Sequence, residues 1–440
     1  MTGSILSTGE ATGILFGLFF LCLFLRVPVA FSLALACLPI LLIEPRLSSM
    51  TLLQETFNIY NSFILLAVPF FLLTANLMNG GGITERLMAL SRSMVGHFPG
   101  GLAQVNIVLS FFFAGISGSS TADAASQSRI FIPAMRKEGY DASFAVAITA
   151  VASVLAVIIP PSILMIIWGG VLTTSIGALF LAGAIPGALI ALALMATVHA
   201  YSKYRGYPTY PREAWKIFLV SLVIAVPALT TPFIIVGGKV FGWFTATEAA
   251  CIAVLYATVI SFLFYRELNV SRFYTALVET GRFAAVALFC VGTAAAFGWL
   301  LAYYKIPEII LSGVSAWELG PIGIGFVVAA TFLVVGCFLD AIPAIIIVGT
   351  ILQPLTVNVG MHPVQFAMIG IISLAFGLVT PPYGLCLLIA TATAQMRLGS
   401  VMVDVMIMLV PMLSVLVLVI LWPDVTLFLP KLLSPEFLNN

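Results

Sequence analysis

Several stretches of this chain are apolar over lengths that exceed a membrane span. No Asp, Glu, Lys or Arg occurs between Asp141 and Lys203, whereas a helix crosses the hydrocarbon core of a bilayer with about 20 residues. Hydrophobic residues make up 62% of the 440 residues and charged residues 8%, a composition that no soluble domain of this length can cover. Strands of membrane β-barrels alternate apolar and polar residues, and these runs do not. The sequence therefore predicts an all-α polytopic membrane protein.

Ten segments are predicted to span the membrane: 12–25, 28–44, 57–79, 141–173, 176–200, 217–237, 245–265, 274–303, 363–396 and 401–428. Two further apolar stretches, 101–136 and 320–356, are interrupted by small and polar residues, and each is long enough to enter, turn and leave on one side. We predict that both are re-entrant hairpins. The loop YSKYRGYPTYPREAWK is the most basic, and placing it in the cytoplasm puts most basic residues on that side. Both termini are then periplasmic, and the hairpins enter from opposite faces.

Each half of the chain has five predicted crossings and one hairpin, and because five is odd the halves must be inverted. The segment from Pro133 to Pro160 and Pro161 aligns without gaps on Pro354 to Pro381 and Pro382, and Gly139 falls on Gly360. Inverted repeats with broken helices are typical of secondary transporters. The alternative is that the repeated proline pair is a coincidence in a chain with 24 prolines.

Four stretches are too irregular for continuous helix: GISGSSTAD (115–123), VIIPPSIL (157–164), VVGCFLDAIP (334–343) and GLVTPPYGL (377–385). Irregular backbone at membrane depth needs partners from protein, water or a ligand, and proline pairs free carbonyl oxygens. Carbonyl and hydroxyl oxygens near one carboxylate suit a monovalent cation such as Na⁺, while helix N-termini suit an anion. The alternative for the two aspartates is helix capping: Ser120 to Asp123 fits a capping box, and Asp340 fits an N-cap followed by Pro343. Both roles can coexist.

Two amphipathic stretches, 83–97 and 305–317, precede the hairpins and suit helices that lie in the membrane interface; the alternative is plain linkers. In the first, Ile83, Leu87, Leu90 and Met94 share a face. The predicted division is N-terminal scaffold helices 1–80, arm 81–98, transport-core half 99–175, scaffold helices 176–304, second arm 305–318, transport-core half 319–397, and C-terminal helix and tail 398–440.

The runs SGSSTADAASQS, IIPPSILMIIWG and LVTPPYGLCLLIA resemble the large membrane subunit of tripartite ATP-independent periplasmic (TRAP) transporters. This resemblance implies Na⁺-driven import of an organic acid by an elevator mechanism, in the bacterial inner membrane. It implies two partners, a small four-helix membrane subunit and a periplasmic substrate-binding protein. Among family substrates, sialic acid is weakly favoured and a C4-dicarboxylate comes next.

The resemblance implies one Na⁺ site between each hairpin tip and the broken helix after it. The expected Na⁺-binding residues are Gly115, Ser117, Ser119, Asp123, Pro160, Ser162, Gly336, Asp340, Thr380, Pro381 and Gly384. The expected substrate-binding residues between the two sites are Ser120, Thr121, Arg129, Pro161, Pro382 and Tyr383. No organic cofactor is expected.

Other functions are weighed against transport with a binding protein. A stand-alone Na⁺/dicarboxylate symporter shares the hairpins and inverted repeats. An intramembrane aspartyl protease needs two carboxylates in contact, whereas Asp123 and Asp340 lie in hairpins that enter from opposite faces. A channel is a further alternative. The net charge of +1, without a long basic tract, argues against nucleic-acid binding.

Overall fold

The computed structural model describes residues 6–315, 318–381 and 383–438, and every regular element in those ranges is helical. The first half contains α1 (Thr8–Phe24), α2 (Val29–Ile43), α3 (Ser49–Tyr60), η1 (Phe63–Leu66), α4 (Ala67–Gly80), α5 (Ile83–Val95), α6 (Gly101–Ser117), α7 (Ser120–Lys137), α8 (Ala142–Ser153), α9 (Leu155–Ile158), α10 (Ile163–Val171) and α11 (Ile176–Arg205). The second half contains α12 (Trp215–Val240), α13 (Ala246–Val259), η2 (Ile260–Phe264), α14 (Val270–Tyr303), α15 (Ile306–Ser315), α16 (Pro321–Phe338), α17 (Ala341–Ala344), η3 (Ile345–Gly349), α18 (Thr350–Asn358), α19 (Pro363–Gly377), α20 (Leu385–Ala394), η4 (Leu398–Ser400), α21 (Met402–Leu421), α22 (Asp424–Leu433) and η5 (Pro435–Leu438).

Within the described residues, eight helices are long and apolar enough to cross a membrane, and α8–α9 with α10 forms a further span bent by 43°. The predicted class of multi-span α-helical protein is confirmed. Two predicted spans have wrong boundaries. The span 57–79 is divided after Tyr60, because the polar pair Asn61 and Ser62 ends α3 and the next helical turn starts at Phe63. The span 401–428 ends at Leu421, because Trp422 precedes Pro423 and adopts an extended conformation.

Two broken helices form the buried centre of the molecule. Phe144–Ser153 of α8 and Val364–Gly377 of α19 are buried at every position. The chain of each helix then becomes irregular, at 159–162 after α9 and at 378–381 and 383–384 after α19, before α10 and α20 begin. Such breaks expose backbone groups deep inside the protein, so they can serve a bound ligand.

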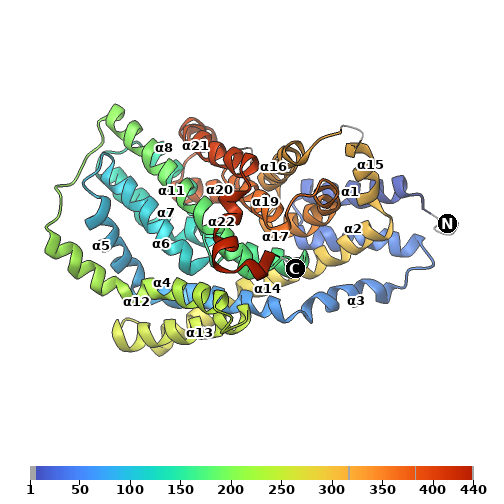
Figure 1. The fold of residues 1–440 in the computed structure, drawn as a ribbon, viewed down its shortest axis with the longest axis horizontal. Helices are drawn as coiled ribbons and strands as arrows, with labels where there is room; N and C mark the ends of the chain where they lie inside the picture. The colour runs from blue at the N-terminus through green and yellow to red at the C-terminus, as the bar shows by residue number, and fades with distance from the viewer. Residues whose placement is uncertain (1–5, 316–317, 382, 439–440) are drawn as a thin grey trace.

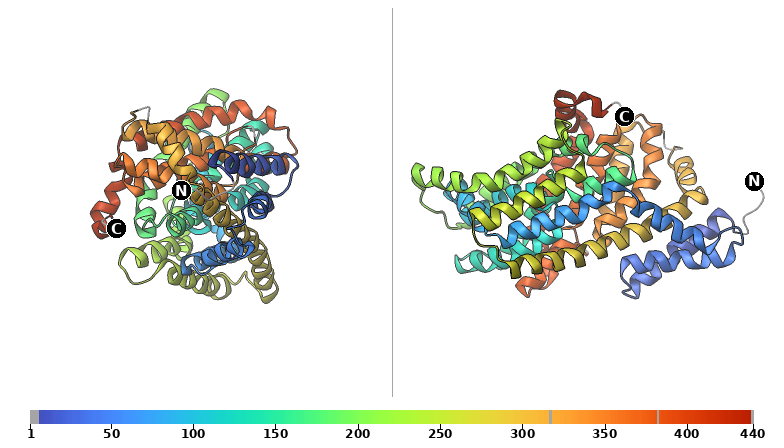
Figure 2. Two further views of the ribbon diagram at one scale, coloured as in Figure 1. Left: turned by 90° about the vertical axis from the view of Figure 1, so that its right-hand side faces the viewer. Right: turned by 90° about the horizontal axis from the view of Figure 1, so that it is seen from below.

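The helices form two layers, which lie on opposite sides of the molecule in Figure 1. In one layer α4 packs against α13 and α14, and α12 packs against α13; Figure 2 shows these long helices running side by side. The other layer holds both hairpins, α8, α19, α20 and α21. By its contacts α11 joins this second layer, since it packs against α6, α19, α21 and α22. The domain ranges stay a prediction, because packing does not establish which elements move together.

Both interrupted stretches fold as helical hairpins. The first consists of α6 and α7, and the second of α16 followed by α17, η3 and α18. The glycines that the repeat alignment pairs, Gly139 and Gly360, both follow a hairpin and both have left-handed backbone, with φ of 86° and 71°. Each ends its hairpin with the same reversal, which glycine adopts without steric cost.

The two predicted arms are helical in the described residues, as α5 and α15. Ile83, Leu87 and Leu90 are buried as expected of one apolar face, but Met94 is exposed. Basic residues at each end of α5 fasten it to later segments. Arg86 forms an ion pair with Glu267 at 2.9 Å, and the Arg92 guanidinium lies 4.5 Å from the ring centre of Tyr210.

The loop 206–214, here called the linker, joins α11 to α12 and contacts the base of hairpin 1. Gly101 N–H donates to Pro208 O at 3.3 Å. The Tyr207 hydroxyl donates to Asp141 at 2.8 Å, and the Tyr210 hydroxyl donates to Glu138. Burial, followed by the bond to Asp141, raises the pKa of Tyr207 above its ordinary value, so the phenol stays protonated and acts as donor.

Candidate functional site

The tip of hairpin 1 touches the first broken helix through backbone. Gly118 connects α6 to α7 with φ of 60°, and Ile163 N–H, at the start of α10, donates to Gly118 O at 3.3 Å. A Cβ atom on Gly118 would lie 2.9 Å from Pro161 O, which is closer than side chains tolerate. Glycine is therefore required at this tip both by its conformation and by the approach of the break.

Asp123 lies just behind this tip, in the first turn of α7, and is 1% exposed. The predicted capping box is wrong: the N-cap is Ser119, one residue earlier, and its hydroxyl accepts from Ala122 N–H at 3.5 Å. Neither carboxylate oxygen of Asp123 has a hydrogen-bond partner among the described residues. The Ser117 hydroxyl lies beside the carboxylate. A buried, unpaired carboxylate costs several kcal/mol, a cost that a bound cation removes.

Hairpin 2 meets the second broken helix in the same way. Gly384 N–H, at the start of α20, donates to Cys337 O near the end of α16 at 3.3 Å. The two backbones also meet at Gly336 and Gly377, where a Cβ on Gly377 would lie 2.7 Å from the Gly336 backbone. Asp340 is the N-cap of α17, as predicted, and its side chain accepts from Ala341 N–H at 2.8 Å. Unlike Asp123, Asp340 is an exposed residue, although its carboxyl group has many protein atoms around it.

One buried residue that sequence reasoning missed lies between the two tips. The thiol of Cys386, in the first turn of α20, lies beside the hydroxyls of Ser120 on hairpin 1 and Ser153 on α8. Its helix, α20, packs against both α7 of hairpin 1 and α8. The structure thus brings the two predicted half-sites together. The signal available in the sequence was the position of Cys386 directly after the second break.

The hydroxyls at the two breaks are occupied by their own helices. Ser162 donates to Val157 O, and Thr380 donates to Phe376 O, each at 2.7 Å. Gly115 lies between α12 and the break, because a Cβ there would lie 2.6 Å from Pro232 of α12 and 3.8 Å from Pro160 O. A hydroxyl that donates its hydrogen keeps its lone pairs, so these hydroxyl oxygens, like the backbone carbonyl oxygens of the breaks, have the chemistry of cation ligands.

The remaining predicted residues range from buried to exposed. Ser117, Ser120, Pro160 and Pro161 are buried, while Ser119, Thr121 and Pro381 are partly buried. Tyr383 is 52% exposed beside the second break. Arg129 is exposed and lies six positions beyond Asp123, about 9 Å along the helix, so the structure does not bring it to the tip. Pro382 lies outside the described residues.

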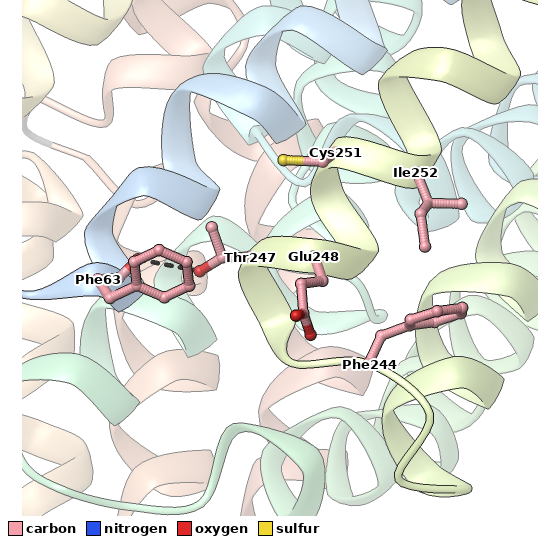
Figure 3. A pocket seen from close by; sticks show the side chains of 6 residues that line it. All are labelled: Phe63, Phe244, Thr247, Glu248, Cys251 and Ile252. Carbon is pink, nitrogen blue, oxygen red and sulfur yellow. Dashed lines mark hydrogen bonds between the residues drawn. The ribbon is translucent and has the colours of Figure 1, made fainter.

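A cavity of about 320 Å³ lies elsewhere, between η1 and the start of α13 (Figure 3). It is lined by Phe63, Phe244, Thr247, Glu248, Cys251 and Ile252. The Thr247 hydroxyl donates to Phe63 O at 2.9 Å, and the Glu248 carboxylate caps its own helix. None of the predicted site residues lines this cavity.

Spanning helices, two hairpins and paired broken helices that enclose a buried carboxylate define a membrane transport protein. The sequence matches the family described as tripartite ATP-independent periplasmic transporter, DctM component, over residues 16–425. The chain belongs to this family of large permeases. It is therefore a transporter and not an enzyme, which removes the aspartyl-protease alternative.

Relatives in the same family are named for different substrates. The chain is 37% identical to the sialic acid TRAP transporter large permease of Vibrio cholerae, over 93% of this chain and 96% of that one. It is 35% identical to the C4-dicarboxylate TRAP transporter large permease of Pseudomonas aeruginosa, over 90% and 93%. The structure of the YdaH transporter of Alcanivorax borkumensis shares the fold, with a TM-score of 0.52 at 14% identity, covering 85% of this chain and 87% of that one.

Proposed function

We propose that this protein imports an organic acid across the bacterial inner membrane by Na⁺-coupled secondary transport. The observation that carries the proposal is the Asp123 carboxylate, buried and without a hydrogen-bond partner among the described residues. It lies behind a hairpin tip that contacts a break in the next helix, where the irregular backbone brings carbonyl oxygens close to the tip. Na⁺ prefers such oxygen ligands, and its charge balances the carboxylate.

The proposed transport unit consists of two inverted repeats that move as an elevator against the layer of long helices. Two observations support the repeats. Each hairpin tip accepts a backbone hydrogen bond from the residue that opens the helix after the break, Ile163 in one half and Gly384 in the other. The aligned glycines that end the hairpins share a left-handed conformation. The proposed orientation places both termini in the periplasm.

The substrate of this proposal is a carboxylate, with sialic acid favoured and a C4-dicarboxylate next, because relatives are named for these acids. It would lie between the tips, near Ser120, Thr121, Pro161 and Tyr383. Since Arg129 is distant from the tip, the anion would depend on the positive ends of α7, α10 and α20. The proposed partners are a small four-helix membrane subunit and a periplasmic binding protein.

Replacing the two hairpin aspartates tests the coupling ion. We expect Asp123→Asn to abolish Na⁺-dependent uptake, because it removes the charge but keeps the volume. We expect Asp340→Asn to weaken it with folding intact, since asparagine also caps helices well. Uptake by the reconstituted complex is measured across Na⁺ gradients. The control is Asp424→Asn, whose exposed carboxylate pairs with Lys431 at 2.6 Å. Unchanged Na⁺ dependence in Asp123→Asn would contradict the proposal.

The alternative, a stand-alone symporter, differs from the proposed transporter because it needs no binding protein. Proteoliposomes that contain the permease and small subunit are tested with and without the soluble binding protein. We expect uptake only when the binding protein is present. Equal uptake without it would favour the stand-alone symporter.

A further inference from the structure

The first break is contacted by glycines of two different elements. The tip of hairpin 1 approaches it through Gly118, where an added Cβ would lie 2.9 Å from Pro161 O. The helix α11 approaches the preceding residues, Ile158 and Ile159, through two buried glycines, Gly183 and Gly187. The position of the break therefore depends on α11 as well as on the hairpin.

The two glycines of α11 lie four residues apart, so they share one face of the helix. A Cβ on Gly183 would lie 2.4 Å from Ile158 O, and a Cβ on Gly187 would lie 2.4 Å from Cγ1 of Ile159. Real Cβ atoms do not come this close to other heavy atoms. Small residues at this spacing let two backbones inside a membrane approach closely. Here they admit the end of α9 and the first residue of the break.

The two contacts differ in how firmly they resist a side chain. The atom nearest to Gly183 in the break segment is a backbone oxygen, which cannot rotate aside. An alanine at position 183 would therefore displace either the end of α9 or α11 itself. The atom nearest to Gly187 belongs to the Ile159 side chain, which can adjust in part. Gly183 thus constrains the break more strongly than Gly187 does.

A displacement at Ile158 reaches the hairpin tip through a short and stiff segment. Only four residues, 159–162, separate α9 from α10, and Pro160 and Pro161 among them have a fixed φ. At the end of this segment Ile163 N–H donates to Gly118 O at 3.3 Å. The contact between break and tip therefore moves when the end of α9 moves.

We propose that Gly183 and Gly187 of α11 are positioning residues for the cation site at hairpin 1. Because they have no side chains, they let the first break lie where its carbonyl oxygens meet the tip in front of Asp123. This inference rests on the proposed Na⁺ coupling.

Alanine substitutions on α11 test the inference. We expect Gly183→Ala to raise the half-saturating Na⁺ concentration about tenfold, equivalent to about 1.4 kcal/mol, and Gly187→Ala to raise it by a smaller factor. The measurement is the Na⁺-dependent rise in melting temperature of the purified permease, with choline replacing Na⁺ and without substrate. A role in stability alone would lower the melting temperature at every Na⁺ concentration and leave the half-saturating concentration unchanged.

The matched control is Gly298→Ala in α14, another glycine inside a long helix. No atom lies within 4 Å of a Cβ added to Gly298, and alanine is the better helix former. We expect an equal or higher melting temperature and an unchanged half-saturating Na⁺ concentration. An unchanged concentration in Gly183→Ala, beside a wild type that responds to Na⁺, overturns the inference alone. A wild type without a Na⁺ response overturns the proposed function as well.

A double variant tests whether the effect is steric. Ile159→Ala removes the Cγ1 atom that an alanine at position 187 would meet. We therefore expect Gly187→Ala with Ile159→Ala to bind Na⁺ more tightly than Gly187→Ala alone. A double variant that binds no more tightly would contradict the positioning role of Gly187. If Gly183→Ala does not fold, Gly187→Ala and its double variant decide the question.

Discussion

Gly118 illustrates how a single position controls the contact between a hairpin tip and a broken helix. Its left-handed backbone turns α6 into α7, and the absence of a side chain admits the carbonyl of Pro161. Gly139, at the other end of hairpin 1, is also left-handed but has no atom within 4 Å of an added Cβ. Substitutions at the two glycines therefore distinguish two effects: backbone strain arises at both positions, whereas steric exclusion by a neighbouring segment arises only at Gly118.

We expect Gly118→Ala to weaken Na⁺ binding by at least tenfold, because the added methyl group pushes the tip away from the break. Gly139→Ala carries the same kind of backbone strain, about 1–2 kcal/mol, and should lower stability while leaving Na⁺ affinity unchanged. Both are measured by Na⁺ titration of the melting temperature. Equal Na⁺ affinity in the two variants would show that the tip contact does not shape the site.

The residues of the site were predictable to different degrees. The stretch 115–123 predicted the position of the tip of hairpin 1, because glycines and hydroxyl side chains are unusual inside an apolar segment. The capping residue was misplaced by one position, since Ser119 and Ser120 are chemically alike. Arg129 stays a prediction: the residue is exposed and starts about 9 Å along α7 from Asp123.

The linker is the loop that connects α11 of one layer to α12 of the other, and its side chains contact the base of hairpin 1. Tyr207 bonds Asp141, which lies just before α8, and is buried. Tyr210 stacks with Arg92 of α5 and bonds Glu138 at the end of hairpin 1. These contacts hold the linker against the base of hairpin 1 and against α5.

We expect Tyr207→Phe to lower the free energy of unfolding by about 1–2 kcal/mol, because it removes a hydrogen bond to a charged partner. Tyr204→Phe is the control, since Tyr204 is 87% exposed on the preceding helix. Thermal unfolding in detergent micelles compares the two. Equal melting temperatures for both variants would contradict a stabilising role for the linker.

At the scale of elements, apolar length predicted most spans, and interrupted apolar length predicted both hairpins. The helix α3 was not predicted. Its sequence, SMTLLQETFNIY, carries polar residues that are unfavourable for a span. It forms because it packs along α14, where the Tyr60 hydroxyl donates to Leu288 O at 3.0 Å. Packing against a helix far away in the sequence cannot be predicted from the hydropathy of the segment itself.

The whole molecule consists of a hairpin layer and a layer of long helices that meet at identifiable contacts. One contact joins α10 to η1, where a Cβ on Gly170 would lie 3.9 Å from the Cβ of Ile64. That separation falls in the range of Cβ atoms in a disulfide. A covalent bond at this place would hold the two layers together.

We expect the double variant Ile64→Cys with Gly170→Cys to lose uptake on oxidation and to regain it after reduction, because an elevator must slide the two layers past each other. Each single cysteine variant is the control and should be insensitive to both treatments. Full uptake by the quantitatively cross-linked protein would contradict relative motion at this contact.

The contact between the linker and hairpin 1 also has a consequence for biogenesis. The backbone of Gly101 and the hydroxyl of Tyr140 both bond Pro208 O, and Pro208 leaves the ribosome long after either residue. Hairpin 1 therefore enters the membrane before its base can close, and it must wait until α11 has been inserted. Chains truncated ahead of the linker would lack both bonds that close the base of this hairpin.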